Sequence, residues 1–150
     1  MKDSKHEISA RQRLGITLYE TYQHVFDKSQ VFFEKFGLTS QQFNVLSILD
    51  EADTPLSTSD ILKRMIEKNA GVSRLVDRLI LKGLIEKKIN VNDRRLIDVK
   101  LTSDGEKLCK QVFSHLSEIE EIYGSLTDKE VETLSNLLSK LIVQPPCSNN

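Results

Sequence analysis

Apolar residues recur along most of this chain at three- and four-residue steps, the spacing that gathers them on one face of an α-helix. The first such run predicts a helix over about residues 8–36, longer than the roughly 10–14 residues usual in globular proteins. Five further helices are predicted, one through residues 43–49 and the others at about 58–66, 70–82, 103–124 and 128–143.

Between the fourth and fifth of these helices the apolar period shortens to two, which is typical of a half-buried strand. Val99 and Leu101, for example, alternate with polar neighbours. The pattern predicts strands at about 84–88 and 96–101, joined as a hairpin by a polar tip. The chain is therefore predicted to be a mainly α protein with a small β-wing, a single domain followed by a flexible tail at 144–150.

Four of the expected helices begin with a hydroxyl residue that is followed three positions later by an acid or an amide. In such a capping box the hydroxyl accepts a free backbone N–H, and the second side chain bonds back to the cap. The four pairs are Thr39 with Gln42, Ser57 with Asp60, Ser103 with Glu106, and Thr127 with Glu130. Gly37 and Gly83 stand where glycines commonly end helices.

Two short helices joined by a tight turn, at about 57–82, precede the hairpin at about 84–101. This order is that of a winged helix-turn-helix, expected here over about 39–101, whose second helix enters the major groove of DNA. The apolar residues of that helix predict an inward face made of Val72, Leu75, Val76 and Leu79. Its polar residues fall on the other side: Ser73, Arg74, Asp77 and Arg78.

The charges of the chain are unevenly distributed. Its 150 residues hold 21 Lys and Arg against 22 Asp and Glu, a balance that by itself argues against a polyanionic partner. Residues 61–100, however, carry eleven basic and five acidic side chains, a net +6, whereas residues 1–60 carry −3 and residues 101–150 carry −4. The basic third coincides with the predicted helix-turn-helix and wing, where contacts to DNA phosphates are expected.

The candidate DNA-binding residues lie in the helix-turn-helix and at the wing tip. Arginine bonds the O6 and N7 atoms of guanine with its planar fork, and serine and asparagine bond bases or phosphates. An arginine at a hairpin tip suits a narrow minor groove, and Asp93 is expected to hold an arginine side chain by a charge-assisted pair. The predicted set is Ser57, Lys68, Asn69, Ser73, Arg74, Arg78, Asp93, Arg94 and Arg95.

The apolar stripes of the helices at about 8–36 and 103–143 are too extensive for one small core. Stripes of this kind usually pair with a partner, so the sequence predicts a homodimer built from both chain ends. The predicted partners are therefore double-stranded DNA and a second copy of the chain.

Other classes of function have less support in the residues. The N-terminus lacks an apolar signal segment, no run is long enough to span a membrane, and Cys109 and Cys147 show no pairing pattern, which favours a cytoplasmic protein. No histidine spacing indicates a metal, and no motif indicates an enzyme or a cofactor. A winged helix used only for protein–protein contact remains the alternative, although such a module does not need the +6 block.

Several segments together resemble the multiple-antibiotic-resistance regulator (MarR) family. They are residues 38–46 (LTSQQFNVL), 72–79 (VSRLVDRL), 82–85 (KGLI), 93–95 (DRR) and 99–105 (VKLTSDG). The resemblance implies a dimeric bacterial transcription regulator, often a repressor, that binds palindromic operators and is released by a ligand or by oxidation. It also implies that Ser73 and Arg74 read the major groove, and that Asp93 with Arg95 or Arg94 forms the wing contact.

The same resemblance implies that a small-molecule effector, where one exists, binds between the dimer helices and the DNA-binding lobe. Tyr19, Tyr22 and His24 are candidates to border such a pocket, although aromatic residues on a long amphipathic helix are more often core. The effector itself stays unknown from the sequence. Peroxide sensing through a cysteine early in the first helix is not expected, because no cysteine precedes Cys109, which should pack as a small hydrophobe.

Overall fold

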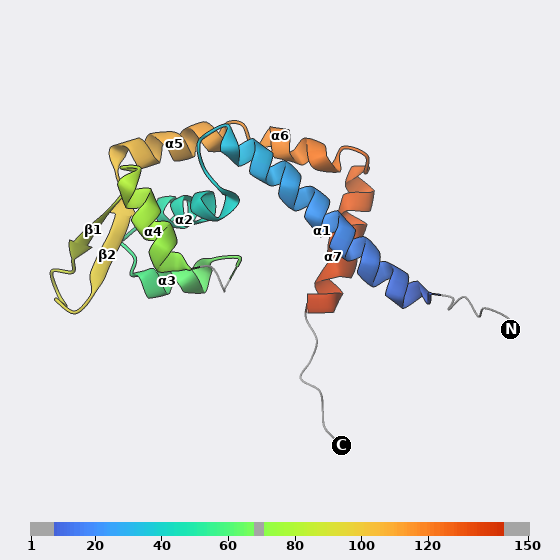
Figure 1. Cartoon of the computed structure of the whole chain (residues 1–150), viewed down its shortest axis with the longest axis horizontal. Coiled ribbons are helices and arrows are strands. Elements are labelled where there is room, and N and C mark those ends of the chain that lie inside the picture. The colour runs from blue at the N-terminus through green and yellow to red at the C-terminus, as the bar shows by residue number, and fades with distance from the viewer. Residues whose placement is uncertain (1–7, 68–70, 143–150) are drawn as a thin grey trace, which may run out of the picture.

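The computed structural model describes residues 8–67 and 71–142, and this part of the chain is mainly helical (Figure 1). Its N-terminal half contains α1 (Ala10–Glu34), α2 (Ser40–Asp50), α3 (Thr58–Arg64) and α4 (Val72–Leu81). A hairpin of β1 (Ile85–Ile89) and β2 (Ile97–Leu101) follows. The chain continues with α5 (Ser103–Phe113), α6 (Ser117–Glu120), the 3-10 helix η1 (Glu121–Tyr123) and α7 (Asp128–Ile142).

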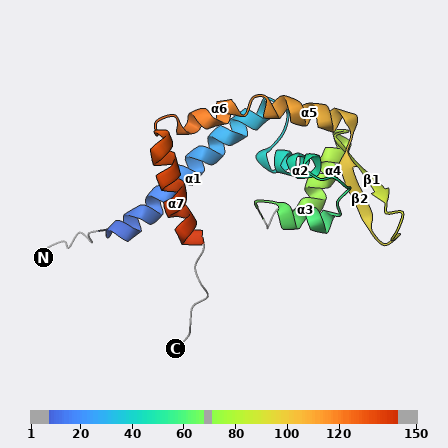
Figure 2. The same cartoon turned by 180° about the vertical axis from the view of Figure 1, so that it is seen from behind.

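The elements form a lobe at one end of the molecule and an extended helical arm at the other. The lobe consists of α2, α3, α4 and the hairpin, with α5 lying across it (Figure 1). The arm consists of α1, α6 and α7, and both views show the hairpin and the first turn of α1 at opposite ends (Figures 1 and 2). This is the winged helix-turn-helix with long terminal helices that the sequence pattern predicts.

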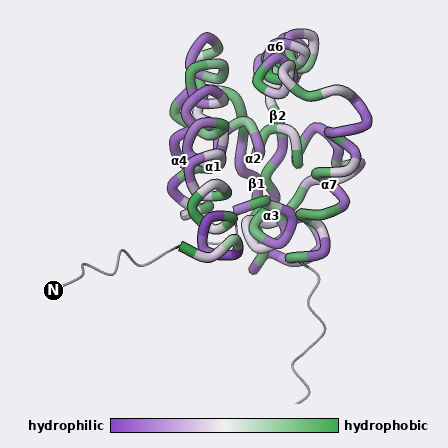
Figure 3. The backbone as a smooth tube through the Cα atoms, turned by 90° about the vertical axis from the view of Figure 1, so that its right-hand side faces the viewer, coloured by the Kyte–Doolittle hydropathy of each residue, from purple (hydrophilic) through white to green (hydrophobic). Residues whose placement is uncertain are grey.

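The hydrophobic core lies inside the lobe. Leu46 of α2, Ile61 of α3 and Val76 of α4 are fully buried, so three helices meet there. The C-terminal end of α1 reaches this core, where the ring of Phe33 stacks on that of Phe43 with centroids 5.0 Å apart. Hydrophobic and hydrophilic stretches alternate along the helices (Figure 3), as expected of helices that bury only one face.

The hairpin is antiparallel, with Ile85 opposite Leu101 at its base and Ile89 opposite Ile97 toward its tip. Leu56, just ahead of α3, joins the outer edge of β2 through two backbone bonds with Val99, 2.8 and 3.1 Å long. Val99 is fully buried. The wing is therefore anchored to the start of the helix-turn-helix as well as to its end.

The predicted caps at Thr39, Ser57 and Thr127 are confirmed by bonds from the backbone N–H three residues on to each hydroxyl oxygen. The reciprocal bond of a capping box is present at Thr39 and Thr127, whereas at Ser57 the Asp60 carboxylate accepts from the cap hydroxyl instead. The fourth prediction is wrong by one residue. The cap of α5 is Thr102, whose Oγ1 accepts the N–H of Gly105 at 3.1 Å and donates to the carbonyl of Gly83 at 2.6 Å. The second bond crosses the hairpin, so local spacing could not distinguish Thr102 from Ser103.

The single helix predicted over 103–124 is also wrong, because the chain bends between α5 and α6. At the bend the hydroxyl of Ser114 donates to the carbonyl of Gln111 at 2.7 Å, a side-chain bond that competes with the helical pattern. The bend lays α6 along α1, where Lys35 Nζ lies 2.6 Å from Glu118 Oε2. The pKa of the Glu118 carboxyl is lowered by this contact, and the hydrogen bond with Lys35 is the largest cause. The described residues thus form seven α-helices rather than six.

Glycine is needed in the lobe for two different reasons, a left-handed backbone conformation and a close backbone contact. Gly37 and Gly83 have φ of 67° and 70°, confirming the predicted helix ends, and side chains rarely tolerate this left-handed conformation. Gly105 serves a different purpose, which the sequence did not reveal. It is buried in the first turn of α5 against the backbone of Leu84, and a Cβ there would collide with the Leu84 carbonyl oxygen.

We expect Thr102→Ala to lower the free energy of unfolding by about 1–2 kcal/mol, because it removes a helix cap and the bond to Gly83. The matched variant Ser103→Ala should change it by less than about 0.5 kcal/mol, since Ser103 is exposed. Urea unfolding followed by circular dichroism measures both. Equal losses in the two variants would contradict the assignment of Thr102 as the cap.

Candidate nucleic-acid interface

Helix α4 presents a sharply divided surface. Val72, Leu75, Val76 and Leu79 are at most 6% exposed, which confirms the predicted inward face. The other predicted face is open to solvent, with Ser73, Arg74, Asp77 and Arg78 all exposed. The residue that precedes the helix is Gly71, which has no side chain to cap the first N–H groups of α4. Lys68 and Asn69, also predicted to bind DNA, lie outside the described residues.

The basic side chains of the lobe divide into two groups according to residue type. The lysines of the wing strands form ion pairs within the protein. Lys87 Nζ lies 2.8 Å from Asp77 Oδ1 of α4, and Lys88 and Lys100 lie 3.2 and 3.1 Å from Glu86 Oε1. These contacts lower the pKa of Glu86, with the bond to Lys100 as the largest cause.

The arginines are exposed and have no such internal contacts. Within residues 8–67 and 71–142, no ion pair or side-chain hydrogen bond engages the guanidinium groups of Arg64, Arg74, Arg78, Arg94 and Arg95. Four of these five were predicted as site residues. Arg64, at the end of α3, was counted in the basic block but not selected, because nothing local in the sequence separates it from a solvated helix end.

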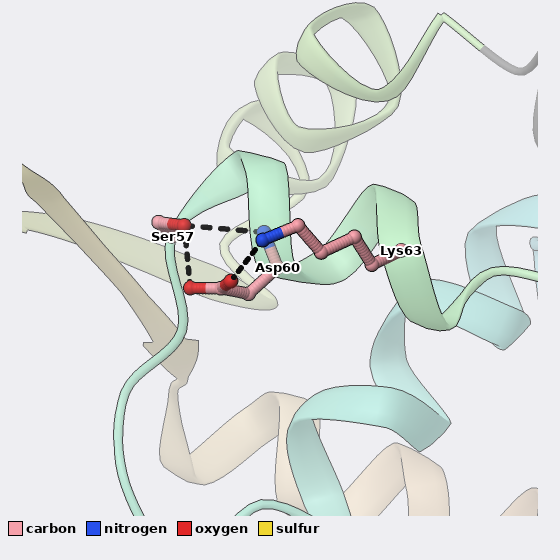
Figure 4. Close-up of polar contacts among 3 residues, drawn as sticks. All are labelled: Ser57, Asp60 and Lys63. Atoms are coloured by element: carbon pink, nitrogen blue, oxygen red, sulfur yellow. Dashed lines mark hydrogen bonds and ion pairs between the residues drawn. The ribbon is translucent and has the colours of Figure 1, made fainter.

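Ser57 was a predicted site residue, and in the structure its side chain caps the N-terminus of α3 (Figure 4). Its Oγ accepts the N–H of Asp60 at 3.1 Å and donates to Asp60 Oδ2 at 2.6 Å. Lys63 Nζ lies 3.4 Å from the other oxygen of the same carboxylate. The hydrogen bond from Ser57, followed by that from Lys63, lowers the pKa of Asp60. Ser57 therefore sets where α3 begins.

The wing tip is shaped by side-chain bonds to the backbone. Asn90 Oδ1 accepts the N–H groups of Asn92 and Asp93, both at 2.8 Å. Asp93 Oδ1 accepts the backbone N–H of Arg95 at 2.9 Å. The predicted pairing of Asp93 with an arginine side chain is therefore replaced by a turn in which the carboxylate orders the backbone. The turn leaves the side chains of Arg94 and Arg95 exposed beyond the hairpin.

The residues proposed for an effector pocket do not form one in the single chain. Tyr19 and Tyr22 are 66% and 61% exposed, and His24 is exposed as well, so they are not core residues here. A cavity of about 260 Å³ lies elsewhere, between the end of α2, β2 and the start of α5, and none of these three residues lines it.

Cys109 is fully buried in α5. Burial raises the pKa of its thiol to about 12, and the nearby charges of Asp50 and Glu106 act in the same direction. Because the thiolate is the reactive form, this cysteine is held in an inert state. Packing as a small hydrophobe, as the sequence predicted, agrees with this burial.

Among residues 8–67 and 71–142, no helix is both long and apolar enough to cross a membrane. The same residues contain no group of three or more His, Cys, Asp or Glu placed to hold a metal ion.

Comparison with known proteins agrees with this geometry. Residues 38–97 match the MarR family. The chain is 34% identical to the multiple antibiotic resistance protein MarR of Salmonella typhimurium, over 86% of this chain and 90% of that protein. It is 32% identical to the transcriptional repressor MdtR of Bacillus subtilis, over 85% of this chain and 83% of MdtR.

Solved structures also resemble this fold. A mutant MarR of E. coli in complex with operator DNA superimposes with a TM-score of 0.77 at 28% identity, covering 87% of this chain and 94% of that one. BpsR of Bordetella bronchiseptica, whose DNA binding is regulated by 6-hydroxynicotinic acid, superimposes with a TM-score of 0.80 at 26% identity, covering 93% and 99%.

The fold and these relatives define a winged helix-turn-helix transcription regulator that binds DNA rather than an enzyme. More specifically, the chain belongs to the MarR family.

The state of Cys109 leads to a testable prediction. In a Cys147→Ser variant, Cys109 should resist a thiol-specific disulfide reagent in the native protein, because a pKa of about 12 leaves only about one thiolate in 10⁴ at pH 8. Reaction should become complete in denaturant, as measured by the absorbance of the released thiol. Rapid reaction of the folded protein would contradict a buried, inert thiol, and Cys109→Ala in the same background supplies the blank.

Proposed function

We propose that this chain is a ligand-responsive repressor that binds a palindromic operator as a homodimer. The observation that carries the proposal is that, within the described residues, the arginine side chains on α4 and at the wing tip form no ion pair or side-chain hydrogen bond. In the same lobe, the lysines of the wing strands are engaged by acidic side chains of the protein. Exposed guanidinium groups without internal partners are the groups available to phosphates and base edges.

In the proposed complex, α4 lies in the major groove. Its buried apolar face keeps the helix on the lobe, so the exposed face with Ser73, Arg74 and Arg78 is the one turned to the bases. Arg74 lies within the first turn of α4, where helix-turn-helix proteins place their base-reading residues. We assign Arg74 to a guanine and Ser73 to a base or a phosphate.

The wing is proposed to reach the neighbouring minor groove. The Asn90 and Asp93 turn orders the backbone of the tip, which reduces the conformational entropy lost when Arg94 and Arg95 bind. The negative potential of narrow A/T-rich minor grooves suits these two arginines.

The homodimer is proposed from the terminal helices. No residue of α7 is buried in the single chain, although Val131, Leu134, Leu138 and Leu141 form an apolar stripe. Leu134 and Leu141 are 44% and 53% exposed. On α1, Leu14 and Ile16 are also about half exposed. A second copy that covers these stripes would generate a two-fold axis, and a two-fold protein reads a palindrome.

The proposal also includes repression and control by a small-molecule effector. MdtR, 32% identical to this chain, is a transcriptional repressor, and the DNA binding of BpsR is regulated by 6-hydroxynicotinic acid. These two relatives support the same mode of action for this chain, with an effector whose chemistry the regulated genes would indicate.

The experiment that tests this function is selection of fragments of the source genome by the purified protein, followed by sequencing. We expect the bound fragments to share an inverted repeat with half-sites about one helical turn, roughly 34 Å, apart. Genes next to the fragments would then indicate the class of effector to add in a release assay. Selection that enriches no common sequence would contradict the proposal and favour a protein-binding winged helix.

We expect Arg74→Ala to weaken binding to the selected operator by about 1–3 kcal/mol and to relax specificity at one base pair, because it removes a bidentate guanine contact. Lys107→Ala is the control, since it removes one positive charge from α5 and not from α4. Fluorescence anisotropy against operator and single-base variants measures both effects. An unchanged affinity for Arg74→Ala would exclude the proposed docking of α4.

We expect the double variant Arg94→Ala with Arg95→Ala to weaken binding most on operators with A/T-rich flanks. If both side chains contact phosphates, the slope of log affinity against log salt should become shallower by about 1.8, since each phosphate contact contributes about −0.9. Titrations at several salt concentrations give this slope. A variant that binds with wild-type affinity and slope would remove the wing from the interface.

We expect Leu134→Asp with Leu141→Asp to convert a dimer into a monomer, because the two carboxylates would have to be buried in the α7 contact. Asn136→Asp on the polar side of α7 adds a charge without touching the stripe and should leave the dimer intact. Sedimentation velocity at micromolar concentration reads out the assembly. A wild-type protein that sediments as a monomer there would contradict the homodimer.

A further inference from the structure

The hairpin has one apolar face that continues past the core. Residues opposite each other in an antiparallel pair point to the same face, and alternate residues along a strand do so too. The register therefore places the pair Ile89 and Ile97 on the same face as Ile85 and Val99. Ile85 and Val99 are at most 2% exposed, whereas Ile89 and Ile97 are 67% and 48% exposed.

The other face of the hairpin is saturated with polar contacts. Glu86 binds Lys88 and Lys100 there, and the side-chain amide of Asn90 bonds both oxygens of Asp98, at 3.0 and 3.1 Å. The hairpin thus has a distinct polar side and apolar side. The exposed isoleucine pair extends the apolar side beyond what the core covers.

The apolar side is the one turned toward α4. Lys87 lies on it by register, opposite Val99, and its Nζ reaches Asp77 Oδ1 on the exposed face of α4 at 2.8 Å. The isoleucine pair therefore continues the surface that begins on α4 and ends at Arg94 and Arg95. An exposed pair of isoleucines on a two-stranded hairpin favours self-association unless something covers it.

The charges around the pair indicate which partner covers it. Arg94 and Arg95 are both exposed at the tip next to it, and α4 presents Arg74 and Arg78 on the other side. A second copy of the chain is disfavoured here, because the surface would bring these arginines together and because the stripes of α1 and α7 lie at the other end of the molecule (Figures 1 and 2). A partner that carries negative charge together with apolar surface matches both the isoleucine pair and the arginines around it.

We infer that Ile89 and Ile97 pack against the deoxyribose rings of the DNA strand that passes between α4 and the wing tip. One sugar–phosphate strand separates a major groove from the adjacent minor groove, so a protein that occupies both must straddle it. The sugars are the apolar part of that strand, between phosphates that the arginines contact. This inference rests on the proposed function and adds to it a contact that does not depend on charge.

The two kinds of contact respond differently to salt. Phosphate contacts release counterions, so their contribution falls as salt rises. Packing of aliphatic side chains on sugars releases none. Removing the isoleucines should therefore shift the whole salt titration by a constant factor, whereas removing the wing arginines should change its slope.

The test is the double variant Ile89→Thr with Ile97→Thr, assayed on the operator selected above. Threonine keeps the branched shape that strands prefer, and both sites are substantially exposed, so the hairpin should remain folded. We expect affinity to fall about tenfold, the effect of about 60 Å² less buried apolar surface, with an unchanged salt slope. The matched double variant Ile89→Val with Ile97→Val retains most of the apolar surface and should lose less than threefold.

Hydroxyl-radical footprinting supplies a second readout, because these radicals attack deoxyribose hydrogens. We expect the wild-type protein to protect a few sugars between the two grooves, and the threonine variant, at saturating concentration, to expose them. Equal affinity and equal protection for the threonine and wild-type proteins would overturn this inference and leave the proposed function intact. If wild-type protein selects no DNA sequence, the proposed function fails together with the contact.

Discussion

The close contact between α5 and the backbone of Leu84 is the constraint on which the arrangement of this molecule depends. Gly105 lets the first turn of α5 lie directly on the Leu84 carbonyl, and Thr102 bonds across to Gly83 at 2.6 Å. The end of α4, both strands of the wing and the start of α5 meet there. The end of α4 and the start of the wing are thus joined to the helix that leads to α6 and α7.

Although the chain is nearly neutral, its lysines and arginines have different roles in the lobe. Lysine is a compact point charge, and in this lobe the lysines of the wing strands balance Asp77 and Glu86. Arginine offers a planar fork suited to phosphates and guanine, and the arginines of the lobe stay exposed. Fewer basic side chains of residues 61–100 are therefore open to a partner than the net charge of +6 suggests. Among the described residues of the lobe, the arginines without internal partners lie at the end of α3, on the outer face of α4 and at the wing tip.

Much of the site was predictable because it depends on local periodicity. The inward face of α4 and the caps at Thr39, Ser57 and Thr127 follow from spacing alone, and the structure confirms them. The errors arose where a long-range contact decided between local alternatives. The α5 cap moved to a residue that also bonds Gly83, and the helix predicted over 103–124 bends where α6 packs along α1. At the wing, the Asp93 carboxylate bonds the backbone of Arg95, which residue types do not reveal.

The sequence by itself determined the class of fold, the faces of the recognition helix and the family, because these depend on apolar spacing and on a few joint motifs. Only the tertiary structure decided which charged side chains form ion pairs inside the protein and which remain exposed without one. It also decided that the apolar side of the wing runs beyond the core toward the tip. The physical reason is that ion pairs and burial depend on distances between residues far apart in the chain, such as Asp77 and Lys87 or Leu84 and Gly105.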